Sequence, residues 1–148
     1  MKKLISFCVV VLFILSACQS SKKNTTDSPS TAVAALNGSW QLTYITGPRI
    51  TFDGLYPNKK PTIIFDVTKK TIAGNAGCNS YGGSLNAQPG KIDFSGPMFS
   101  TQMACAEDEM TGETTYLQML KKVNAFSVSD STLHFMAGNL VLMSFTKK

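Results

Sequence analysis

Two of the four cysteines, both in the part of the chain that is expected to fold, and the one histidine are the side chains that could form a reactive or metal-binding site. Cys78 lies in a glycine-rich stretch at residues 77–83, Gly-Cys-Asn-Ser-Tyr-Gly-Gly, and Cys105 ends the stretch Thr-Gln-Met-Ala-Cys at residues 101–105. A thiol nucleophile needs a neighbouring base, and His134 is the only histidine. A zinc ion needs three or four ligands, which this set barely supplies. We therefore expect no catalytic residue, no metal and no other cofactor.

A disulfide between Cys78 and Cys105 is the interpretation that we favour for this pair. The beginning of the chain indicates export, and an exported pair of cysteines meets an oxidising compartment. Closing a loop of about 27 residues would stabilise the fold by roughly 3–4 kcal/mol in the loop-entropy description. Two unreactive buried thiols remain the alternative.

The first 17 residues have the pattern of a bacterial signal peptide. Lys2 and Lys3 precede an apolar run at residues 4–15, which is shorter than the roughly 20 residues of a membrane-spanning helix. The following Leu-Ser-Ala-Cys at residues 15–18 resembles the lipobox of bacterial lipoproteins, in which the cysteine is acylated. We therefore expect lipidation at Cys18; an ordinary signal peptide that happens to carry a cysteine is the alternative.

Acylation of Cys18 implies a place in the cell. Stable anchoring requires at least two buried chains, and a lipoprotein carries a diacylglycerol together with an amide-linked acyl chain such as palmitate. Gln19 stands where enterobacterial sorting uses aspartate for retention in the inner membrane. The expected location is therefore the bacterial cell envelope, with the lipid in the outer membrane and the protein facing the periplasm.

Residues 18–35 are predicted to be the lipidated cysteine followed by a flexible linker, since they are rich in Ser, Thr, Lys and Asn. The net charge of +5 falls to about +3 once Lys2 and Lys3 are removed with the signal peptide. The remaining basic residues come as scattered pairs without interleaved aromatic residues, which argues against a nucleic-acid partner. The expected partners are the membrane, through the anchor, and an envelope protein.

The rest of the chain, residues 36–148, is predicted to be a single α+β domain. Alternating apolar residues and turn signals predict strands at residues 39–46, 62–68, 71–75, 81–86, 91–94, 125–128, 132–136 and 140–145. Short strands with tight turns favour a curved antiparallel sheet or a partly open β-barrel, which one helix covers. Trp40 is expected in the core, and the long loop Gly47–Lys60 is a candidate binding loop.

The covering helix is predicted at residues 107–123. Its first turn carries Glu107, Asp108 and Glu109, and its last turn carries basic residues, as the helix dipole favours. An apolar stripe follows helical spacing and consists of Tyr116, Leu117, Leu120 and Val123. The acidic cluster could hold a cation, but solvated carboxylates that match the dipole explain it as well.

At these residues the chain resembles the META domain of HslJ-like heat-shock proteins. The resemblance rests on residues 77–83, on Thr101 and residues 103–105, and on Glu113, Tyr116 and Leu120 of the helix. Residues 40–42 and Leu133, Leu140 and Leu142 fit the same pattern, so it covers residues 36–145. It implies a small α+β domain, often carried by envelope lipoproteins and linked to heat-shock response and antibiotic resistance, without an established enzymatic activity.

The sequence alone is compatible with three functions. The first is a non-catalytic envelope lipoprotein that binds protein partners or acts in the stress response. The second is a carrier of a small molecule or lipid, in which Phe52, Phe65, Phe94, Phe99 and Phe135 would line a cavity of the curved sheet. The third is an enzyme that uses Cys78 or Cys105, which a count of free thiols would exclude or support.

Overall fold

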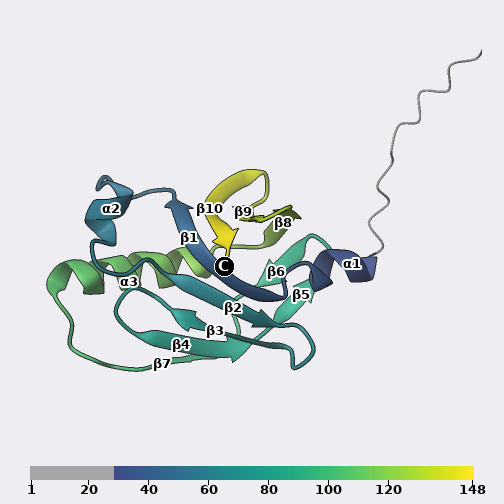
Figure 1. The fold of residues 1–148 in the computed structure, drawn as a ribbon, viewed down its shortest axis with the longest axis horizontal. Helices are drawn as coiled ribbons and strands as arrows, with labels where there is room; N and C mark the ends of the chain where they lie inside the picture. The colour runs from purple at the N-terminus through teal and green to yellow at the C-terminus, as the bar shows by residue number, and fades with distance from the viewer. Residues whose placement is uncertain (1–28) are drawn as a thin grey trace, which may run out of the picture.

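The computed structural model describes residues 29–148, which form an antiparallel sheet curled into a half-barrel (Figure 1). The sheet has ten strands in the order β5-β6-β8-β9-β10-β1-β2-β3-β4-β7. Their bounds are β1 Gly38–Ile45, β2 Thr62–Asp66, β3 Thr71–Asn75, β4 Ser80–Ser84, β5 Asn86–Gln88, β6 Lys91–Asp93, β7 Met98–Ser100, β8 Ala125–Ser129, β9 Thr132–Ala137 and β10 Leu140–Lys147. The predicted α+β fold with a curved antiparallel sheet is confirmed. The predicted signal peptide and Cys18 lie outside the described residues.

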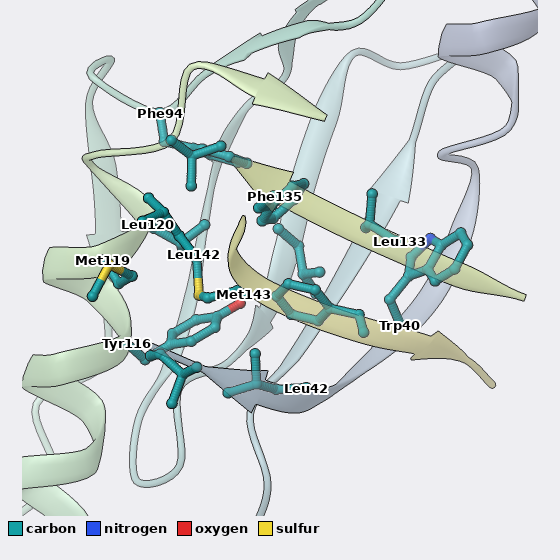
Figure 2. Packing of buried hydrophobic residues seen from close by; sticks show 14 of the residues in the cluster. Trp40, Leu42, Phe94, Tyr116, Met119, Leu120, Leu133, Phe135, Leu142 and Met143 are labelled. Carbon is teal, nitrogen blue, oxygen red and sulfur yellow. The ribbon is translucent and has the colours of Figure 1, made fainter. Parts of the chain in front are cut away.

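The helix that covers the sheet is α3, Glu107–Leu120, which ends slightly before the predicted residue 123. It packs Tyr116, Met119 and Leu120 against the sheet, and in Figure 2 these side chains face the strand that carries Leu142 and Met143. None of the helices in residues 29–148 combines the length and apolarity needed to cross a bilayer.

Two further helices, α1 Pro29–Ala34 and α2 Phe52–Leu55, were not predicted. Helix α1 lies inside the stretch predicted to be a linker; Val33 packs against the core and the following Leu36 is fully buried. The ordered part therefore begins before residue 36. Helix α2 is a single turn within the predicted loop Gly47–Lys60, and the Thr51 side chain caps it by accepting from the Gly54 N–H.

Aromatic rings form the centre of the core (Figure 2). The Phe135 ring makes edge-to-face contacts with Phe65, Phe94 and Phe145, at centroid distances of 6.3, 5.3 and 5.1 Å. Trp40 is fully buried, as expected, and its indole N–H donates to the Leu36 carbonyl over 2.7 Å. The alternation of apolar residues in the sequence therefore predicts correctly that Trp40 and Phe135 are buried.

The two strands that end the sheet, β5 and β7, were not predicted as separate strands. The expected strand at residues 81–86 divides at Leu85, so that β4 ends at Ser84 and β5 begins at Asn86. Strand β7 has only three residues and follows Pro97. A proline predicts the interruption of a strand, so the sequence did not indicate one here. Both ends of the sheet are thus made of strands too short to show a period of two.

Candidate functional site: the cysteine stretches and the surface beside them

Cys78 and Cys105 form a disulfide, with their Cα atoms 6.1 Å apart. The bond joins the loop between β3 and β4 to the segment that leads into α3. Cys78 is buried and Cys105 is half-buried. Oxidised in this way, neither sulfur is a thiolate, so the pair supplies neither a resting nucleophile nor metal ligands.

His134 lies elsewhere in the sheet. It is on β9, which four strands separate from β4, and its Nδ1 lies 2.8 Å from the Ser144 Oγ of β10. The structure therefore does not bring the histidine to either cysteine, as the nucleophile and zinc hypotheses require. No group of three or more His, Cys, Asp or Glu side chains with a metal-binding arrangement occurs within residues 29–148.

Asn79 is the residue around which the two cysteine stretches are organised. Its buried Oδ1 accepts from the Thr101 hydroxyl and from the Met103 N–H, each over 2.8 Å. Its Nδ2 donates to the Met103 carbonyl over 3.4 Å and lies 3.2 Å from the Cys78 sulfur. Its own N–H donates to Glu113 Oε2 over 2.8 Å, so one residue links the loop, the second stretch and α3.

Asn75, at the end of β3, shapes the loop from the other side. Its Oδ1 accepts from the Gly77 N–H over 2.9 Å, and its Nδ2 donates to the Cys78 carbonyl over 3.2 Å. Gly77 has a φ of +113°, in a region that side-chain-bearing residues avoid. No buried side-chain nitrogen or oxygen among the described residues lacks a hydrogen-bond partner. We refer to Asn75, Asn79, Thr101 and Glu113, with the backbone groups that they bind, as the Asn79 network.

Tyr81 and Tyr116 form a second hydrogen-bonded group, in the core. Their hydroxyl oxygens lie 2.7 Å apart, and the Tyr81 hydroxyl also donates to the Thr62 carbonyl over 3.1 Å, which leaves Tyr116 to donate to Tyr81. Burial raises the pKa of both phenols well above their ordinary value; the neighbouring Tyr81 raises that of Tyr116 further. Both tyrosines are therefore held neutral and serve as hydrogen-bonding core residues.

Helices α2 and α3 are joined by a close contact at Gly112. The Tyr56 hydroxyl donates to the Gly112 carbonyl over 3.1 Å. A Cβ at Gly112 would lie 2.6 Å from the Leu55 carbonyl oxygen and 2.9 Å from the Tyr56 ring. Asn58 also donates to Glu109 Oε1 over 2.9 Å. The predicted binding loop is therefore fixed against the first half of α3.

A hollow of about 460 Å³ lies at this contact and is lined by Ile50, Gly54, Leu55, Glu107, Asp108 and Thr111. A second one, of about 410 Å³, adjoins it on α3 and is lined by Cys105, Glu107, Met110, Thr111, Thr114 and Thr115. Ile50 and Met110 are 55% and 50% exposed. We call this region the α2–α3 surface. Of its three predicted acidic residues, Glu107 and Asp108 line the hollow, whereas Glu109 is bound by Asn58.

The five phenylalanines proposed to line a cavity do not do so together. Phe65, Phe94 and Phe135 pack against one another in the core. Phe52 is half-buried on α2 against Tyr56, and Phe99 is 73% exposed on β7. The carrier hypothesis therefore loses the lining on which it was based.

Comparison with known proteins agrees with this architecture. The META domain family matches residues 32–148 of the chain. The chain belongs to the META domain family. The match spans the sheet, the disulfide and α3, which confirms the resemblance seen at residues 77–83 and 101–105. No curated protein matches the sequence of this META domain chain.

Solved structures show the same fold at low sequence identity. An NMR structure of a protein from Burkholderia xenovorans has a TM-score of 0.63 and 22% identity, over 78% of this chain and 86% of that chain. Another NMR structure has a TM-score of 0.54 and 20% identity, over 76% and 90% of the two chains. A crystal structure of a DUF4847 family protein from Bacteroides vulgatus has a TM-score of 0.51 and 11% identity, over 76% and 94%. At these identities the likeness concerns the fold alone.

Sequence reasoning identified the motif but not the roles of its members. The sequence indicated Cys78, Cys105 and the glycines as the residues that shape the motif. In the structure, Asn79 makes most of the hydrogen bonds that join the loop to the second cysteine stretch and to α3. Asn75 was not singled out. An asparagine two residues before a glycine that needs a positive φ is a recognisable turn signal, and it could have indicated Asn75.

Proposed function

We propose that this META domain protein is a non-catalytic protein-binding module of the bacterial cell envelope, anchored in the outer membrane through Cys18. The observation that carries the proposal is the α2–α3 surface, where large apolar side chains are exposed beside a hollow. Exposed apolar side chains that gather at one place are typical of protein interaction sites. A role in the stress response is proposed from the family resemblance.

The α2–α3 surface has the rigidity that a binding site needs. Tyr56 and Gly112 fix the loop to the helix, and Thr51 caps the turn that presents Ile50 and Gly54. A partner that buries Ile50 and Met110 therefore does not have to order the surface first, which reduces the entropy cost of association. Glu107 and Asp108 at the rim favour a partner with basic residues around an apolar centre.

The residues that the sequence offers for chemistry support the same proposal. Cys78 and Cys105 hold the loop to the segment before α3, and Asn79 and Glu113 bind backbone groups. Each of these groups already has a structural partner. The proposed function therefore depends on the shape of the surface that they support.

Site-specific photo-crosslinking in cells tests this proposal. A photoreactive amino acid replaces Ile50 or Met110 in the full chain, and Thr68, an exposed residue of the β2–β3 turn, is the control. We expect the same crosslinked protein from positions 50 and 110 and none from position 68. Identical products at all three positions, or none at positions 50 and 110, would contradict a partner on this surface.

The anchor is tested separately. A Cys18→Ala variant is expected to leave the membrane fraction, as measured by fractionation of cell envelopes. Continued membrane association of the variant would show that another feature holds the protein there.

A further inference from the structure

The two ends of the sheet differ in what lies beside them. At one end, helix α1 packs against β5. At the other end β7 runs beside a groove of about 380 Å³, whose far wall is the last part of α3. The groove is lined by Tyr81, residues 95–100, Leu117 and Lys121. It is separate from the α2–α3 surface and shares none of the residues that line that surface.

The backbone of β7 directs hydrogen-bonding groups away from the sheet. Phe99 pairs with Gly82 of β4, and the Thr101 N–H donates to the Ser80 carbonyl over 3.0 Å. In an antiparallel ladder every second residue exchanges both bonds with its neighbour, so Phe99 shares with Thr101 the side that faces β4. The N–H and C=O groups of Met98 and Ser100 therefore point outward, at the spacing that an additional strand requires.

The side chain of Phe99 is held in place although 73% of it is exposed. Its ring lies over Gly82, where a Cβ would come within 2.5 Å of the ring. The next residue in this row across the sheet is Ala73, followed by Ile64, which is itself exposed. Phe99 is thus the edge member of an exposed apolar row, and it is the member of that row on which a side chain of an added strand can pack.

The far wall of the groove, which Leu117 and Lys121 form, determines which side chains the added strand should carry. Leu117 is a half-buried apolar residue, and Lys121 forms no ion pair with any residue in the described part of the chain. Lys121 directly follows α3 and still has helical backbone angles, so it lies about 6 Å from Leu117 along the helix axis. Alternate side chains of a strand are separated by a similar distance of about 6.7 Å.

We propose that this groove binds an extended acidic peptide by strand addition to β7. The peptide backbone bonds to the outward groups of Met98 and Ser100. One of its inward side chains is apolar and packs on Leu117, and the inward side chain two residues away is a carboxylate that pairs with Lys121. Edge-strand addition draws its affinity from main-chain bonds and its specificity from alternate side chains.

The test is NMR titration of the full chain with short capped peptides of alternating threonine and valine. The probe carries leucine and glutamate at two consecutive inward positions, and the comparison peptide has lysine in place of the glutamate. At up to about 2 mM peptide, a ligand with a Kd near 1 mM is detected. We expect amide shifts at Met98, Ser100 and Lys121, with the lysine peptide binding roughly tenfold more weakly.

Variants assign the contacts. Lys121→Glu should reverse the preference between the two peptides, whereas Lys122→Glu, which changes an adjacent exposed lysine outside the groove, should preserve it. Ser100→Pro removes one outward N–H without removing a bond to β4, and it should weaken both peptides alike.

Three results of the titration would overturn the proposal, and a fourth, seen without peptide, would do so as well. The three are no amide shifts at the highest peptide concentration, shifts outside the groove, and a preference that Lys121→Glu leaves unchanged. Shifts at Met98 and Ser100 that depend on protein concentration without peptide would show that a second copy of the chain occupies the edge instead. None of these results bears on crosslinking at Ile50 and Met110, so this proposal and the α2–α3 surface fail independently.

Discussion

The Asn79 network and the groove beside β7 lie next to each other but use their polar groups in opposite ways. In the network, the side-chain amides of Asn79 and Asn75 form hydrogen bonds with backbone groups of the same chain. In the groove, the backbone groups of Met98 and Ser100 face away from the sheet, and Lys121 has no acidic partner in the described residues. The comparison teaches that the most recognisable motif of this chain makes its hydrogen bonds within the fold, whereas the backbone groups on which the strand-addition proposal rests lie in a less conspicuous segment.

Within the two cysteine stretches, removing the disulfide should have the largest effect on stability. A double variant, Cys78→Ser with Cys105→Ser, frees a loop of 27 residues and should lose roughly 3–4 kcal/mol of unfolding free energy. Urea denaturation of oxidised wild type and variant measures the difference. A loss below about 1 kcal/mol would mean that the Asn79 network holds the two stretches together without the covalent bond.

Asn79→Ala should follow, with a loss of about 2–3 kcal/mol. It removes the buried Asn79 amide, which accepts from the Met103 N–H and the Thr101 hydroxyl at a partly buried contact between the two cysteine stretches. Asn139→Ala, at the exposed turn between β9 and β10, is the matched control and should change stability by less than about 0.5 kcal/mol. Equal denaturation midpoints for the two variants would show that the network is dispensable.

The buried tyrosines predict unfolding at alkaline pH. Burial raises the pKa of Tyr56, Tyr81 and Tyr116 in the folded chain, whereas unfolded tyrosines ionise near pH 10. Both states are neutral below that pH, so stability is unaffected there. Above it only the unfolded chain ionises, and stability should fall by about 1.4 kcal/mol per pH unit for each of these tyrosines.

Urea denaturation at several pH values measures this slope. Tyr81→Phe should reduce this slope by the contribution of one tyrosine, about 1.4 kcal/mol per pH unit. A stability that does not change between pH 9 and 12 would contradict the neutral, buried state of these phenols.

Phe99→Ala should have the smallest effect on stability, about 0.5 kcal/mol or less, because its ring is mostly exposed. Phe135→Ala, in the centre of the core, should cost about 3–5 kcal/mol. Thermal and urea denaturation compare the two. A large loss for Phe99→Ala would mean that the edge strand depends on this ring and that its exposure does not indicate a contact with a partner.

Much of the sheet could be predicted because its long strands alternate. Trp40 and Leu42 of β1 and Leu133 and Phe135 of β9 are buried at every second position, as the period of two requires. Helix α3 was recognisable from its acidic start and its apolar stripe. These signals are local, and therefore a single sequence contains them.

The features missed are those that depend on contacts between distant residues or on very short elements. Strand β7 forms because Met98–Ser100 reach β4, and three residues show no periodicity. Helix α2 contains a glycine, and its contact with α3 through Tyr56 and Gly112 joins residues 56 positions apart. The partners of Asn79 at Thr101, Met103 and Glu113 are likewise remote in sequence.

The most direct test of a structural role for the motif is the redox state of its cysteines in the native protein. The full chain is isolated from cell envelopes without reductant, denatured, alkylated and digested, and the peptides are identified by mass spectrometry. We expect one peptide in which Cys78 is linked to Cys105 and no alkylation at either residue. Alkylation of both cysteines in protein taken directly from cells would contradict the account, because free thiols would then be available for chemistry beside Asn79.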